Sequence, residues 1–183
     1  SELFPHKTNP KVPNYDIDFA QELLEQIGEK ARSYNQRLTF HPGQYNVIGT
    51  KNERTLKKTI KDLQYHADVL DAMGLDNNSV MVVHGGGVYG NKEETIERWC
   101  KNYKNLPESI KNRLVLENCE RCYSIVDCLK ISKKTGIPVV FDTHHFECYK
   151  ILHPTEKFED PSKYMYDILQ SWIAKGVKPK FHI

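Results

Sequence analysis

The sequence predicts an α/β barrel of the TIM type, in which parallel strands alternate with helices. Short apolar runs of strand length alternate with amphipathic helical patterns along the 183 residues, and this alternation is typical of a parallel sheet with right-handed crossovers. Five of the runs end on or carry a histidine or a carboxylate, and the carboxyl ends of barrel strands meet at one mouth. An open doubly wound sheet is the alternative, but the sequence lacks the glycine fingerprint that this architecture carries near its first strand.

The individual elements follow from apolar spacing and from turn residues. The first helix begins after Asp16 or Asp18, and its apolar residues recur at helical spacing. Pro42 and Gly43 break the chain after the second strand, and Gly176 ends the last helix. We expect strands at residues 1–4, 37–41, 79–84, 113–117, 138–142 and from 178 onward. We expect helices at residues 16–34, 53–73, 92–105, 124–134 and 162–175, with a long loop over 143–161.

The length suits one domain, residues 1–183. A TIM barrel usually needs about 250 residues, and the chain opens on what reads as a strand end and stops inside a strand. We therefore expect a partial barrel domain that lacks strands at both ends.

Composition excludes some classes of protein and leaves others open. The 26 basic and 24 acidic residues nearly balance, which neither favours nor excludes nucleic acid, because basic groups can gather around one groove. No apolar run is long enough to span a bilayer, so no membrane partner is expected. The odd number of cysteines, five, favours a reducing compartment, the cytoplasm or the nucleus. The single pair with C-x-x-C spacing, Cys119 and Cys122, is interpreted as incidental.

The strand ends supply the candidate ligands. The runs RLTFH, VMVVH, RLVLE and PVVFD end at His41, His84, Glu117 and Asp142, and KPKFHI carries His182. Imidazole nitrogens and carboxylate oxygens gathered at one mouth form a cage for divalent cations. A buried carboxylate is costly without a partner, so Glu117 needs a cation or a salt bridge. His145, in the loop after Asp142, can turn into the same mouth.

Three features allow a functional and a structural interpretation. Gln44 and Tyr45 lie at a loop tip after Pro42 and Gly43, where they can touch a ligand or simply form a turn. The three glycines after His84 permit close approach of a ligand, or form a flexible loop. Lys180 shares a strand face with His182. It is either deprotonated or carbamylated into a bridging carboxylate beside the metals, or a lysine at the strand edge near solvent.

Taken together, the motifs resemble the ultraviolet damage endonuclease family, which is related to endonuclease IV and xylose isomerase. The resemblance rests on HPGQY at 41–45, HGGG at 84–87, LEN at 116–118, DTHH at 142–145 and KFH at 180–182, in that order. SELFPH at 1–6 also resembles the start of a family segment. It implies a TIM barrel that acts as a monomer on damaged double-stranded DNA and nicks it 5′ to ultraviolet photoproducts. It also implies up to three divalent ions, typically manganese.

The resemblance further assigns roles to single residues. It makes Lys180 the carbamylated lysine and a catalytic residue together with Glu117 and His145, and it gives Gln44 and Tyr45 the task of probing the lesion. The metal shell that it implies comprises His41, His84, Glu117, Asp142, His145 and His182. A further family histidine lies near the N-terminal loop, where His6 is the candidate and Asn9 the alternative.

Two other functions stay open. A sugar isomerase on the same scaffold would use two metals, but HPGQY has no evident task in it; a nicking assay set against an isomerase assay separates the two. A non-catalytic DNA-binding relic is the other alternative, and metal content together with nicking by the full-length protein decides it.

Overall fold

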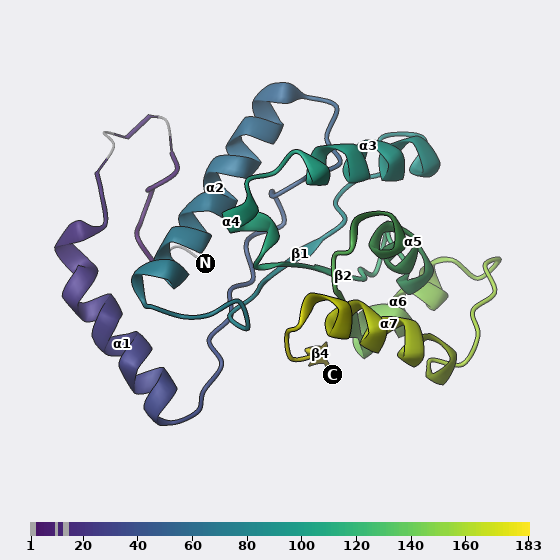
Figure 1. The fold of residues 1–183 in the computed structure, drawn as a ribbon. Helices are drawn as coiled ribbons and strands as arrows, with labels where there is room; N and C mark the ends of the chain where they lie inside the picture. Colours follow the sequence, from purple (N-terminus) through teal and green to yellow (C-terminus); the bar gives the residue numbers. More distant parts are fainter. Residues whose placement is uncertain (1–2, 10, 13–14) are drawn as a thin grey trace.

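The computed structural model describes residues 3–9, 11–12 and 15–183 (Figure 1). Its four strands form one parallel sheet in the order β1-β2-β3-β4. They span Met81–His84, Leu114–Glu117, Val139–Asp142 and Phe181–His182. The register places His84 opposite Glu117 and Asp142 opposite His182, so the polar strand ends lie side by side.

Helices cover the sheet, and their apolar faces form the core. Trp99 and Trp172 are fully buried in that core. In Figure 1, α1 and α2 lie together at one end of the sheet, while α5, α6 and α7 gather at the other. The helices are η1 (Asp18–Ala20), α1 (Gln21–Ser33), α2 (Glu53–Ala72), α3 (Lys92–Lys104), α4 (Glu108–Lys111), α5 (Ile125–Thr135), α6 (Thr143–Leu152) and α7 (Ser162–Lys175).

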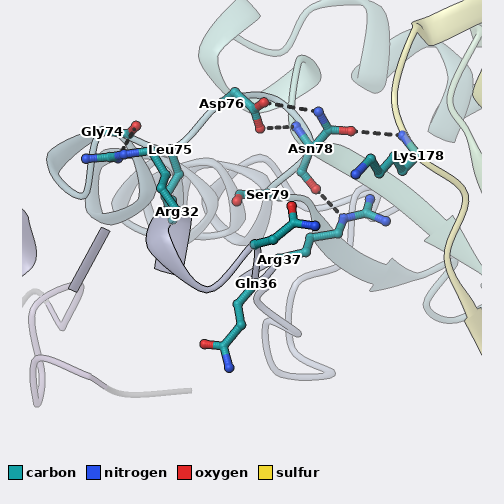
Figure 2. A pocket seen from close by; sticks show the side chains of 10 residues that line it. Arg32, Gln36, Arg37, Gly74, Leu75, Asp76, Asn78, Ser79 and Lys178 are labelled. Carbon is teal, nitrogen blue, oxygen red and sulfur yellow. Dashed lines mark hydrogen bonds between the residues drawn. The ribbon is translucent and has the colours of Figure 1, made fainter. Parts of the chain in front are cut away.

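The sheet curls, and contacts at the amino ends of its strands hold the curl. Arg37 lies just before the segment that pairs with β1 at one edge of the sheet, and Pro179 lies just before β4 at the other edge. Arg37 Nη1 donates to the carbonyl oxygen of Pro179 at 3.1 Å. Asn78, just before β1, accepts the backbone N–H of Lys178 at 2.9 Å. Figure 2 shows these side chains around a hollow of about 260 Å³. The predicted parallel α/β fold is confirmed in this curved arrangement.

Several predicted strands are shorter than expected. The range 37–41 forms only an isolated parallel bridge, between Phe40 and Met81. Of the strand expected at 1–4, residues 3 and 4 form a bend and residues 1 and 2 lie outside the described part. The last strand begins at Phe181 and not at 178. Edge segments have a pairing partner on one side only, which explains why these runs form few ladder bonds.

Two helices differ from the prediction. The range 143–161, expected to be a loop, contains α6, whose weak apolar periodicity gives little helix signal in the sequence. Asp142 caps that helix and accepts the backbone N–H of His145 at 2.7 Å. The short α4 after Pro107 was also missed.

None of the described helices combines the length and the apolar character that crossing a bilayer requires. All five cysteines are free thiols.

Candidate metal centre

The carboxylate of Glu117 lies at the centre of three histidines. Its side chain is buried, with the residue 0% exposed at the end of β2. His41 Nε2 lies 2.9 Å from Oε2, and His84 Nε2 lies 3.5 Å from the same oxygen. His182 Nδ1 hydrogen-bonds the other oxygen, Oε1. Rings from both edges of the curled sheet meet here, because His41 and His182 stack with centroids 6.1 Å apart.

Asp142 and His145 extend the cluster on the side of β3. Asp142 Oδ2 lies 3.8 Å from His182 Nδ1 and 3.9 Å from His145 Nδ1. The ring of His145 lies 5.2 Å from that of His84, between centroids. The structure therefore brings together the six side chains that were expected to converge from the strand ends.

Asn118 links these residues through both ends of its amide. The residue is 1% exposed. Its Nδ2 donates to the carbonyl oxygen of Asp142 at 3.0 Å, and its Oδ1 accepts the N–H of Asp142 at 2.8 Å. Its own carbonyl oxygen lies 2.9 Å from His145 Nδ1. Nδ1 therefore carries the proton, which leaves the lone pair of His145 on Nε2.

The charges of the cluster suit a cation site. Burial raises the pKa of Glu117, but the hydrogen bond from His41 and the charges of His84 and His182 outweigh it and lower the pKa to about 2. The bond to Glu117 raises the pKa of His41, against a smaller opposing effect of burial. Burial lowers the pKa of His84. The lowered pKa values of Glu117 and His84 favour the ionised carboxylate and neutral imidazole that metal binding requires, whereas the raised pKa of His41 opposes it, because a bound ion would have to displace the proton of that ring.

The donor set fits divalent ions. Two groups share Glu117, one with His41 and His182 and one with His84 and His145, and in each group the ligand atoms lie within 4.8 Å of one another. Among the described residues, His84 Nδ1 is buried without a hydrogen-bond partner. The other ring nitrogen, Nε2, faces Glu117 Oε2 at 3.5 Å, so Nε2 is the atom that an ion shared with Glu117 would use. Nitrogen and carboxylate oxygen ligands suit manganese, iron and zinc.

Lys180 and His6 are not joined to the cluster. Lys180 is half-buried just before β4, and none of the hydrogen bonds or ion pairs among the described residues links it to the six ligand candidates. His6 is exposed, and together with Asn9 and Asp62 it lines a small separate hollow.

Gln44 and Tyr45 project from the loop of residues 43–47. Both are exposed, and Tyr45 is 83% exposed. With Asn9 and Thr59 they line a hollow of about 610 Å³ between this loop, α2 and the N-terminal segment. They lie on the loop that follows His41, so they are adjacent to the cluster in sequence.

The glycines after His84 serve close packing. A Cβ on Gly85 would lie 2.5 Å from the ring of Tyr123, and one on Gly86 would lie 2.9 Å from Val47 Cγ1. Gly86 also has a φ of +84°. The helix after them, α3, begins at Lys92, so a phosphate cradle directly at its N-terminus is not formed.

Some site residues had no role in the sequence analysis. Glu120 Oε2 lies 3.9 Å from His145 Nε2. Asn118 was part of a motif, but its clamp on Asp142 was not foreseen. The sequence signal for that clamp is an amide directly after an apolar strand that ends in a carboxylate.

A curled parallel α/β sheet with histidines and carboxylates at its strand ends defines the class of TIM-barrel-type proteins with a candidate metal centre. The family model described as UV-endonuclease UvdE matches residues 1–183, and the chain belongs to that family. The resemblance stated from the motifs is thereby confirmed.

Curated relatives agree with this membership. The chain is 38% identical over 186 residues to a putative UV-damage endonuclease of Acanthamoeba polyphaga mimivirus, covering 100% of this chain and 55% of that protein. It is 38% identical over 188 residues to the UV-damage endonuclease of Schizosaccharomyces pombe, covering 100% of this chain and 31% of that protein. It is 37% identical over 184 residues to the UV DNA damage endonuclease of Bacillus velezensis, covering 100% and 56%. The chain thus spans about half the length of these relatives, or less.

Two solved structures share the fold. The crystal structure of SacUVDE matches with a TM-score of 0.80 and 33% identity, over 91% of this chain and 55% of that one. Endonuclease IV from Thermus thermophilus matches with a TM-score of 0.58 and 17% identity, over 90% of this chain and 58% of that one. The second likeness concerns the fold alone.

Proposed function

We propose that this protein is a metal-dependent DNA repair endonuclease that nicks damaged double-stranded DNA 5′ to ultraviolet photoproducts and related lesions. The observation that carries the proposal is the buried Glu117 carboxylate, which three histidines surround at the strand ends of a chain from the UvdE family.

The metal shell is proposed to hold up to three divalent ions, with manganese as the native metal. Such ions polarise a phosphodiester, lower the pKa of a bound water and stabilise the departing oxygen. The proposed ligands are His41, His84, Glu117, Asp142, His145 and His182.

The protein's own groups prepare the site for this chemistry. Glu117 has one oxygen directed at His41 and His84 and the other at His182, so both of its oxygens would be available to hold divalent ions. Asn118 holds His145 in the tautomer that presents Nε2. Lys180 is proposed as a carbamylated ligand, which requires it to turn toward His182, its neighbour on the same strand face.

Lesion recognition is assigned to Gln44 and Tyr45. Damaged nucleotides unstack at lower cost than intact ones, and an exposed amide and ring on a projecting loop can enter the gap that such nucleotides leave. His6 is proposed as the further metal ligand near the N-terminus, with Asn9 as the alternative. The protein is proposed to act as a monomer inside the cell.

The proposal is tested by nicking of irradiated and unirradiated duplex DNA by the full-length protein, with manganese or with a chelator. We expect nicks 5′ to photoproducts only in irradiated DNA with metal present. Glu117→Gln should abolish them, and Glu97→Gln, an exposed ion-paired carboxylate on α3, should not. Isomerase activity without nicking would favour the sugar isomerase, and DNA binding without metal or nicking would favour the relic.

A further inference from the structure

The carboxylate of Asp62 joins two segments that are far apart in the sequence. Asp62 lies on α2, and its Oδ1 accepts a hydrogen bond from the Thr8 hydroxyl at 3.0 Å. Its Oδ2 accepts one from Asn46 Nδ2 at 2.8 Å. The N-terminal segment and the loop of residues 43–47 therefore meet on one side chain.

Asn46 passes this restraint to the loop. It is buried, and its Nδ2 also donates to the carbonyl oxygen of Gly43 at 3.1 Å, while its backbone N–H donates to the same oxygen at 3.0 Å. The N–H of the next residue, Val47, donates to the Thr59 hydroxyl at 3.2 Å. The C-terminal end of the turn that carries Gln44 and Tyr45 is thus tied to α2 through two consecutive residues, and Asn46 closes the turn back onto Gly43.

The exposure of Tyr45 makes these ties important. At 83% exposed, its ring receives little support from packing, so the backbone of the loop sets its direction. Bonds to an ionised carboxylate are shorter and stronger than bonds between neutral groups. Asp62 supplies such a bond to the turn itself, through Asn46.

We propose that Asp62 is the positioning residue that aims the 43–47 loop, and that it thereby sets the discrimination between damaged and undamaged DNA. This inference rests on the proposed function and deepens it. A group that must enter a gap in the DNA works only from one orientation, and a misplacement of about 1 Å can lower a rate by about a hundredfold.

The experiment compares Asp62→Ala and the milder Asp62→Asn with Asp68→Ala in the full-length protein. Asp68 lies on the same helix and is exposed, and its side chain bonds Gln64, so its loss removes the same charge without touching the loop. Three quantities are measured: hydrogen exchange of residues 43–47 without DNA, the ratio of Kd values for unirradiated and irradiated duplex, and bound manganese.

In Asp62→Ala we expect faster exchange over 43–47 and a Kd ratio reduced by about tenfold to a hundredfold, which is the loss expected when the Tyr45 ring no longer stacks on the DNA, with manganese content unchanged. Asp62→Asn, which keeps one acceptor oxygen, should show a smaller change, and Asp68→Ala none.

Unchanged exchange over 43–47 in Asp62→Ala overturns the inference, and so does faster exchange with an unchanged Kd ratio. If the wild-type protein fails to prefer irradiated DNA, the proposed function fails, and the exchange measurement still decides whether Asp62 positions the loop.

Discussion

At the scale of single residues, the site depends on how a buried charge is compensated. Glu117 is fully buried, and three imidazoles contact it. An imidazole neutralises the carboxylate only while protonated, whereas a divalent ion does so in the neutral range and leaves the rings as neutral ligands. Residues that contact the ligand candidates, such as Asn118, should therefore influence metal affinity through the way they hold those ligands.

Asn118→Asp should weaken metal binding. The substitution keeps the shape of the side chain but replaces the N–H that donates to the Asp142 carbonyl with a second oxygen, and the resulting repulsion displaces Asp142. Loss of such outer contacts typically costs about 10–100-fold in metal affinity. Titration with manganese measures the loss, and Asn112→Asp, an exposed position after α4, is the control. Equal affinity in the two variants would show that the clamp has no influence on the metals.

Tyr45→Ala should impair recognition of damaged DNA while leaving the metals in place. Stacking of a base on an aromatic ring is worth about 1–3 kcal/mol, which corresponds to a loss of about tenfold to a hundredfold in affinity. Affinity for irradiated DNA and manganese content are compared with those of Tyr34→Ala, another exposed tyrosine at the end of α1. Unchanged affinity, or loss of metal together with affinity, would make Tyr45 a structural residue of its loop.

At the scale of elements, the buried strands and the long helices could be predicted, and the short edge elements could not. Strand β2 is apolar on both faces, and this pattern identifies it from the sequence alone. Phe40 forms a single bridge because the edge offers few partners. Helix α6 has no clear apolar stripe, and its start depends on Asp142, whose position at a strand end indicates a ligand and gives no sign of a helix cap.

The same division holds for the candidate site. Strand-end positions predicted which side chains meet, because parallel strands in register bring their ends together. The pattern could not predict the clamp by Asn118 or the restraint by Asp62, because both depend on side-chain directions across segments far apart in the sequence.

Gly86→Ala should destabilise the protein more than Gly90→Ala. Both glycines have a positive φ, +84° and +88°, so both substitutions incur about 1–2 kcal/mol of backbone strain. The added Cβ at Gly86 would also lie 2.9 Å from Val47 Cγ1, whereas the one at Gly90 would have no atom within 4 Å. Overpacking of this kind typically costs about 1–3 kcal/mol more. Unfolding in urea measures the difference, and equal losses would mean that the 43–47 loop moves aside freely.

At the scale of the whole molecule, the candidate metal centre connects both edges of the sheet. An ion that binds only the folded state at about a hundred times its Kd stabilises that state by about 2.7 kcal/mol. The metal should therefore contribute to the stability of the entire fold.

Manganese should raise the Tm of the full-length protein by about 5–10 °C, given a shift of about 2–4 °C per kcal/mol for a domain of this size. Glu117→Gln should remove most of this rise, because it deprives both ligand groups of their shared carboxylate. Thermal unfolding with manganese and with chelator is compared for the wild type, Glu117→Gln and Glu97→Gln. A rise that persists in Glu117→Gln would locate the stabilising ion elsewhere.

The stacking of His41 on His182 has a consequence for the newly made chain. These two rings belong to opposite edges of the described sheet, so the centre requires contacts between residues far apart in the sequence. Such non-local contacts form slowly. We expect the group formed by His41, Glu117 and His182 to remain without bound metal in a growing chain until the segment with His182 has left the ribosome and the sheet has curled. Under the proposed function, a chain made only in part would therefore lack the complete centre.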